Sequence, residues 1–375
     1  VQHVLAMFAS NVTPSIIIAG AAGFAFGGED MVYLVQMAML FAGVATLFQT
    51  IGLGPIGARL PVMQGTSFAF VPIMIGIVKT SGMAALFGAV IVAGLFHTFL
   101  GSVIGRIRYW FPPLVTGIVI TAIGLALLPV GIKYASGGAA AFQMNAPEWG
   151  DFSRWGLALV VIFVALGFKF FTRGTMSSAA ILIGLIAGYV VGYLTGAVNF
   201  GGVAKAAWFA VPQPFKYGIE FSAFAIIGMC LMSLVSAIET VGDISGIAKG
   251  GANREATDKE LSGGTYADGF GSFIAGLFGG LPNTSFSQNV GLISMTGVMS
   301  RSVVTLGALF LVACGLIPKV GAVVAAMPIS VLGGGVIMMF GMVVSAGINM
   351  LSGVNWNRRN MIILAMSLSV GLGIQ

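Results

Sequence analysis

Long runs of apolar residues dominate this chain and limit what it can fold into. Clear examples occupy residues 31–53, 83–104, 114–132, 156–171 and 178–198. A helix needs about 20 apolar residues to cross the hydrocarbon core of a bilayer, whereas a barrel strand shows a shorter alternating segment. Because these runs have helical length, the sequence predicts an all-α integral membrane protein whose surroundings are the lipid bilayer.

Charged residues are too scarce to cover a surface that faces water. They make up 7% of the chain, hydrophobic types make up 58%, and the mean hydropathy is +1.02. A soluble domain carries roughly 25% charged residues. The net charge of +6 would suggest nucleic acid in a soluble protein. Here the basic residues lie in loops, as the positive-inside rule describes, so we expect no nucleic acid partner.

The apolar runs predict thirteen membrane spans, the last of them incomplete. They are residues 1–22, 31–53, 62–80, 83–104, 113–132, 155–172, 177–198, 222–246, 262–280, 284–300, 302–325, 328–350 and 358–375. Eleven Lys and Arg residues lie in or beside loops after even-numbered spans, against six after odd-numbered spans. We therefore expect a multi-pass protein of the plasma (inner) membrane with a cytoplasmic N-terminus.

Two distant stretches of the chain resemble each other. The triplet Thr-Ser-Phe occurs at 66–68 and again at 284–286, 218 residues later, each time shortly after Leu-Pro. Pro113 and Pro328, which open later spans, are 215 residues apart. Two similar offsets predict two copies of a seven-span unit. Because seven is odd, the second copy is inverted, as in many secondary transporters, and the full fold would have 14 spans with about 13 here.

Polar residues gather where spans 3 and 10 begin, above all in TSFSQNVGLISMTG at 284–297. Thr and Ser favour local backbone alternatives to helix. We expect a short extended segment that breaks each span, followed by a half helix whose free N–H groups point toward a shared centre. The alternative is a continuous Ser/Thr-rich helix that merely hydrogen-bonds its neighbour.

Ionisable residues inside spans mark candidate functional positions. Glu239 and Asp243 lie one turn apart on span 8, where a charge costs roughly 2.5–3.5 kcal/mol at the bilayer centre. Asp268 lies early in span 9, nearer the expected cytoplasmic side, and either a structural or a functional role is open. His3 is a proton carrier or, as we favour, a hydrogen-bonding strut. His97 is interpreted as a packed or interfacial histidine.

Several of these stretches resemble the nucleobase–ascorbate transporter family, of the xanthine/uracil permease type. QNVG at 288–291 with Thr-Gly at 296–297 resembles the family signature, and ETVGD at 239–243 resembles its span-8 motif. GTSF at 65–68 resembles its span-3 segment, and Gln-His at 2–3 its span-1 opening. Members with Gln first in the signature are mostly xanthine or urate carriers, so the resemblance is greatest to bacterial xanthine or urate permeases.

The resemblance implies a fold and a function. It implies a core domain from 1–104 and 222–326, a gate domain from 105–221 and 327–375, and a homodimer. The implied activity is proton-coupled import of a nucleobase, most of all xanthine, by alternating access. The coupling ion would be H⁺, and we expect no other cofactor and no metal.

The resemblance and the chemistry of a purine edge together select candidate residues. Gln288 can pair with the edge, Glu239 can accept two ring N–H groups, and Phe68 can stack on the ring. Backbone amides at 67–68 and 287–288 would complete the contacts. The substrate-binding candidates are Glu239, Gln288, Phe68, Ser67, Ser287 and Phe286, and the candidates for proton coupling or site support are Asp243, His3, Asn289, Asp268 and Thr296.

Other functions remain as alternatives. A urate, uracil or other nucleobase symporter would use the same arrangement. An anion transporter of the same fold is disfavoured because Glu239 would repel its substrate. A channel would line a pore with rings of side chains or carbonyls. An enzyme is disfavoured because no HExxH or GxSxG pattern occurs.

Overall fold

The structure is a computed structural model that describes residues 2–107, 112–138, 141 and 149–373. The chain divides into two compact units, which are described separately. Unit 1 comprises Val1–Arg106, Arg173–Ala179 and Asn199–Ala326, and unit 2 comprises Ile107–Thr172, Ala180–Val198 and Met327–Gln375. Residues 173–179 and 199–221, which we expected in the gate domain, belong to unit 1. The roles of core and gate stay predictions.

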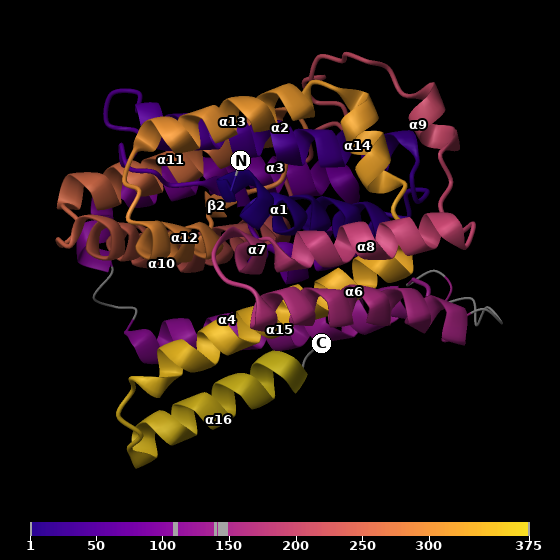
Figure 1. The fold of residues 1–375 in the computed structure, drawn as a ribbon. Coiled ribbons are helices and arrows are strands. Elements are labelled where there is room, and N and C mark those ends of the chain that lie inside the picture. Colours follow the sequence, from indigo (N-terminus) through magenta and orange to yellow (C-terminus); the bar gives the residue numbers. More distant parts are fainter. Residues whose placement is uncertain (1, 108–111, 139–140, 142–148, 374–375) are drawn as a thin grey trace. The chain divides into compact units, whose positions relative to one another are not determined.

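Unit 1 consists of helices and one short pair of strands (Figure 1). Its helices are α1 (Gln2–Ala21), α2 (Glu29–Ile51), α3 (Val71–Ile107), α7 (Thr175–Ser178), α9 (Gly201–Lys205), α10 (Ala223–Ala252), α11 (Asp258–Leu277), α12 (Ser287–Thr296), α13 (Arg301–Gly315) and α14 (Pro318–Ala325). Its strands are β1 (Gln64–Thr66) and β2 (Asn283–Ser285). Helix α2 is central, because it packs against α1, α11, α13, α14 and β1.

The two strands confirm that short extended segments break spans 3 and 10. They pair antiparallel, with Gly65 opposite Thr284 at the centre. We call β1 with the start of α3 the first crossing, and β2 with the start of α12 the second crossing. A Cβ on Gly65 would lie 2.5 Å from the Phe286 ring and 2.8 Å from Asn11 Oδ1, so this crossing requires glycine. Strand β2 leads directly into α12, which ends at Gly297 in the left-handed region (φ 68°).

Some predicted spans differ from the observed helices. Spans 3 and 4 share one helix, α3, which bends at Gly82 (φ 82°) instead of ending in a loop. Span 11 is a pair, α13 and α14, that meets at 84° beside Pro318. Within the described residues, seven helices are long and apolar enough to cross a membrane, or eight with that pair. Thirteen were expected, and the difference arises because several spans are short, bent or polar helices.

Unit 2 is held together by close helix packing. Its helices are α4 (Pro113–Ala135), α6 (Phe152–Phe171), α8 (Ala180–Leu194), α15 (Ile329–Ser352) and α16 (Arg358–Gly373). Gly117, Gly124 and Gly131 repeat every seven residues along α4, and a Cβ on each would lie 2.6–3.0 Å from an α15 side chain. Small residues thus let the α4 and α15 backbones approach, as is common between membrane helices.

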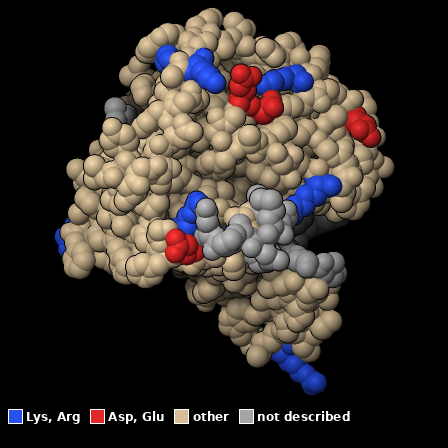
Figure 2. Space-filling view, turned by 90° about the vertical axis from the view of Figure 1, so that its right-hand side faces the viewer, with Lys and Arg blue, Asp and Glu red and all other residues tan. Residues whose placement is uncertain are grey.

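Large apolar side chains lie exposed along several helices. Examples are Phe163 and Phe170 on α6, Leu231 on α10, and Leu306 and Phe310 on α13, which are 57–76% exposed. Figure 2 shows a face on which Lys, Arg, Asp and Glu form only small groups and most of the surface carries none of them. Exposed apolar surface on this scale is unfavourable in water and suits lipid tails.

Candidate functional site

The start of α12 is tied to α10 through Asp243. The Asp243 carboxylate accepts hydrogen bonds from the Ser285 hydroxyl (2.6 Å) and the Ser287 hydroxyl (2.7 Å). The residue is only 8% exposed. Two donated hydroxyl hydrogens compensate for much of the water that a buried carboxylate loses. Asp243 therefore fixes β2 and the first turn of α12 against the middle of α10.

Glu239, one turn earlier on the same face of α10, is held differently. It is partly exposed, and none of the described residues forms a hydrogen bond or ion pair with its carboxylate. Gln288, the second residue of α12, is exposed and likewise has no side-chain partner among the described residues. Because α10 and α12 pack together, two free polar groups lie on neighbouring helices. Such groups are available to a ligand.

The first crossing, β1 and the start of α3, contributes mainly apolar surface. Phe68 is partly exposed, and its carbonyl accepts the Val71 N–H (3.0 Å) at the start of α3. We expected the backbone amide of Ser67 to contact substrate. Instead, the Ser67 N–H donates to the Pro282 carbonyl (2.9 Å) and is not free. The buried Ser67 hydroxyl has no partner among the described residues.

Phe286 faces the interior of unit 1. It is 5% exposed and packs with Val4, Met7 and Met63 in a buried apolar cluster. Its N–H donates to the Met63 carbonyl (3.0 Å). The geometry therefore gives Phe286 a packing role at the crossing instead of a surface for substrate.

Asp268 is fully buried and joins several elements of unit 1. Its Oδ1 accepts hydrogen bonds from the side-chain amides of Gln49 (2.9 Å) and Gln64, and its Oδ2 accepts one from the Thr240 hydroxyl. These partners come from α2, β1 and α10. Sequence reasoning missed all three. The signal for Gln49 was an amide inside the apolar run of 31–53.

His3 and Asn289 form a bridge between α1 and α12. The Asn289 amide nitrogen donates to the His3 carbonyl oxygen (3.0 Å) and lies 3.0 Å from His3 Nδ1. Since an amide N–H only donates, Nδ1 is the acceptor and the ring proton of neutral His3 lies on Nε2. This geometry suits the strut role for His3 and the site-support role predicted for Asn289.

Thr296 and His97 lie away from the start of α12. The Thr296 hydroxyl donates to the Leu292 carbonyl (2.8 Å) and accepts the Val298 N–H (3.4 Å), so it supports the far end of α12. His97 is 1% exposed on α3, and its Nε2 has no partner among the described residues. Neither side chain joins the free groups of Glu239 and Gln288.

Contacts at the two strands repeat each other. The Gln64 N–H donates to the Thr46 hydroxyl (2.9 Å), and the Asn283 N–H donates to the Ser272 hydroxyl (2.8 Å). Thr66 bonds Asn11 of α1, as Ser285 bonds Asp243 of α10. The central residues of the two strands, Gly65 and Thr284, are 219 positions apart in the sequence, and so are the other equivalent strand positions. The Thr-Ser-Phe triplets are 218 residues apart, so aligning them in the sequence differs by one residue from the alignment of the two strands in the structure.

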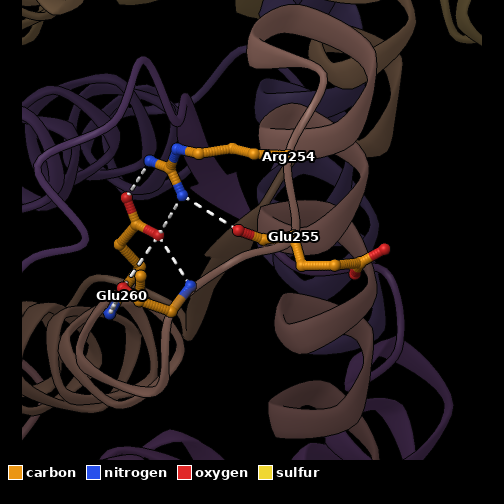
Figure 3. A network of polar contacts seen from close by, with 4 residues as sticks. Arg254, Glu255 and Glu260 are labelled. Carbon is orange, nitrogen blue, oxygen red and sulfur yellow. Dashed lines mark hydrogen bonds and ion pairs between the residues drawn. The ribbon is translucent and has the colours of Figure 1, made fainter.

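The turn between α10 and α11 is held by charged groups outside the predicted spans (Figure 3). The Arg254 guanidinium binds both carboxylate oxygens of Glu260, at 2.8 and 2.5 Å, and donates to the Glu255 carbonyl oxygen (3.0 Å). Glu260 also forms a capping box with Thr257. The bond from Arg254 is the main cause that lowers the pKa of Glu260 to about 2. This turn connects the helix of Asp243 to the helix of Asp268.

A comparison with family models decides the class of the protein. The model of the Permease family (Xan_ur_permease) matches residues 1–375. The chain belongs to this family. Two curated relatives agree: the uric acid permease PucJ of Bacillus subtilis is 37% identical, over 99% of this chain and 83% of its own length. The xanthine permease of the same organism is 36% identical, over 100% of this chain and 84% of its own.

The fold of this permease resembles that of solved transporters. The transmembrane domain of the cyanobacterial bicarbonate transporter BicA has a TM-score of 0.68 and 16% identity, over 100% of this chain and 95% of that one. This likeness concerns the fold alone. It confirms an all-α fold, and the permease relatives confirm a transporter instead of an enzyme. The family likewise supports a multi-span membrane location.

Proposed function

We propose that this permease imports a purine nucleobase, most of all xanthine, together with a proton. The observation that carries the proposal is the free carboxylate of Glu239 on α10, with the exposed Gln288 amide on the adjacent α12. A xanthine edge carries ring N–H donors and carbonyl acceptors. A carboxylate accepts such donors, and an amide both donates and accepts. Phe68, partly exposed at the first crossing, would stack on the ring.

The different surroundings of the carboxyl groups support proton coupling at Glu239. Asp243 and Asp268 already accept hydrogen bonds that stabilise their charge, whereas Glu239 accepts none from the described residues. Without substrate, protonation removes the cost of a bare charge at membrane depth. Substrate N–H groups and the proton then bind to one site and bias one conformational equilibrium.

Alternating access would follow from two inverted repeats. The matching contacts at β1 and β2 support this organisation, since an antiparallel pair of equivalent strands is related by a two-fold axis. We further propose the core and gate roles, the cytoplasmic N-terminus, the plasma membrane location and a homodimer. Distances between cysteines placed in the two units, measured with and without xanthine, test the motion.

Uptake experiments test the substrate and the coupling. Cells that express the permease should accumulate labelled xanthine, and a protonophore should abolish the accumulation. Excess unlabelled xanthine should compete best, followed by urate, with uracil weakest. Competition by urate alone would make urate the proposed substrate, in line with the relative PucJ, which is named a uric acid permease. Inhibition by sulfate but not by xanthine would support the anion transporter instead.

A further inference from the structure

The two oxygen atoms of the Asp268 carboxyl have chemically different neighbours. Oδ1 accepts from the amide nitrogens of Gln49 (2.9 Å) and Gln64, while Oδ2 contacts the Thr240 hydroxyl. An amide N–H can only donate, whereas a hydroxyl can donate or accept. A proton on Oδ1 would displace one of two N–H bonds. A proton on Oδ2 needs only that the Thr240 hydroxyl turn round.

The orientation of the Gln49 amide is itself fixed. Its oxygen accepts the Ala58 N–H (3.1 Å), and its nitrogen also donates to the Gly264 carbonyl (2.9 Å). A flipped amide would lose all of these bonds inside a fully buried site. Gln49 therefore keeps an N–H directed at Oδ1 whatever the protonation state of Asp268.

Buried hydroxyl groups continue from Oδ2. The Thr240 hydroxyl lies 3.5 Å from that of Thr284, and the Ser236 hydroxyl donates to Thr284 at 3.1 Å. Ser236, Thr240 and Thr284 are at most 4% exposed. Thr284 is the central residue of β2, opposite Gly65. The chain of hydroxyls thus runs from Asp268 past the strand crossing to α10.

We propose that Gln49 and Gln64 are positioning residues that confine the proton of Asp268 to Oδ2, and that Thr240, Thr284 and Ser236 relay this proton. The inference rests on the proposed proton coupling. Ser236 lies three residues before Glu239 and shares its face of α10. The relay therefore links the proposed substrate site to the carboxyl on α11.

The proton movement balances without any co-reactant. With Asp268 ionised, each hydroxyl hydrogen points toward Oδ2. A proton that reaches the Ser236 oxygen lets Ser236 pass its hydrogen to Thr284, Thr284 to Thr240, and Thr240 to Oδ2. Each hydroxyl gains one hydrogen and loses one, and all then point away from Asp268. Only O–H bonds form and break.

Other titratable groups lie near the Asp268 carboxyl. The carboxyls of Asp243 and Glu239 interact with it electrostatically from α10, and the backbone of His97 on α3 lies beside Gly269, the next residue of α11. In the described parts of α2 and β1, the facing groups are the two amides. A change in pH dependence must therefore be traced to Thr240 by variants that leave these groups intact.

Thr240→Val removes the first hydroxyl of the relay and keeps the side-chain shape. In proteoliposomes with a pH-sensitive dye, xanthine-driven proton entry should fall roughly tenfold or more, since positioned proton transfer typically contributes at least that much. Thr240→Ser should restore it. Thr265→Val is the matched control, because among the described residues the buried Thr265 hydroxyl bonds only the Leu261 carbonyl of its own helix (2.9 Å). If Thr240→Val does not fold, Ser236→Ala should slow proton entry in the same way.

Difference infrared spectroscopy examines the carboxyl without transport. The band of the protonated Asp268 carboxyl, assigned by its loss in Asp268→Asn, should shift in Thr240→Val and remain in place in Thr265→Val. Normal proton entry and an unshifted band in Thr240→Val overturn the relay while the proposed function stands. Xanthine uptake without proton entry in the unaltered protein overturns the proposed coupling and the relay together.

Discussion

The two strand crossings of unit 1 share a frame and differ in chemistry. Residues 68–70 of the first crossing are Phe-Ala-Phe, and their equivalents at 287–289 are Ser-Gln-Asn. Thr66 is held by a neutral amide, Asn11, whereas Ser285 is held by a carboxylate, Asp243. The same hydroxyl and backbone contacts position both crossings. Stability thus comes from contacts common to both, and the polar groups that we propose for the substrate are concentrated at the second.

The largest effect is expected at Glu239, on the helix that packs against the second crossing. Glu239→Gln should abolish accumulation of xanthine against a gradient, because a neutral amide cannot take up and release a proton as a carboxyl group does. Folding should change little, since no described residue pairs with this carboxylate. Uptake with and without a protonophore, together with thermal unfolding in detergent, measures both. Normal accumulation in this variant would remove Glu239 from the mechanism.

Exchanging the two anchoring side chains tests whether the crossings are interchangeable. Asn11→Asp should destabilise unit 1 by about 1–3 kcal/mol or more, because a buried carboxylate would lose the donor to the Ala38 carbonyl and face its oxygen. Asp243→Asn should fold, since an amide can still bond both serine hydroxyls, but uptake should fall. Thermal unfolding and uptake of both variants measure these effects.

Equal stability in Asn11→Asp and the unaltered protein would contradict the difference between the crossings. Thr13→Val is a suitable control, because Thr13 is equally buried on α1 and its hydroxyl bonds only the Ala9 carbonyl (2.7 Å) within the part of the chain that the structure describes.

A smaller effect is expected at Gln288. Gln288→Glu should weaken xanthine binding by about 1–3 kcal/mol, because the donor to a xanthine carbonyl is lost, and should favour pyrimidines in competition. Gln213→Glu changes an exposed glutamine outside α12 and serves as the control. An unchanged competition profile in Gln288→Glu would assign recognition to another residue.

The smallest effect concerns the turn that supports the second crossing. The folded-state pKa of Glu260 is about 2, below its usual 4.5, so its contribution to stability is present above about pH 4.5 and is lost as the pH falls toward 2. Glu260→Gln should therefore lower the unfolding temperature slightly at pH 7, and the difference should shrink near pH 3. Glu255→Gln, at an exposed acid 3.9 Å from Lys249, should change nothing at either pH. A difference that grows toward pH 3 would reverse the sign of this interaction.

Local composition determined much of this protein. The apolar runs set the membrane class, and the Ser/Thr clusters set the places where spans 3 and 10 break, because both depend on residues adjacent in the chain. Glu239 and Asp243 of span 8 could be selected as functional candidates because a charge in an apolar helix is costly and usually marks a functional position. A boundary was predicted between residues 80 and 83, but its form, a bend at Gly82 inside one helix, was not, since glycine permits a left-handed backbone without requiring it.

The tertiary structure decided what each polar group does. Asp268 became a junction only because folding brought Gln49, Gln64 and Thr240 to it from three other elements. Ser67 lost its free amide to Pro282, more than 200 residues away. A hydrogen bond depends on a few tenths of an ångström and on direction, and no spacing along the chain encodes these across such separations.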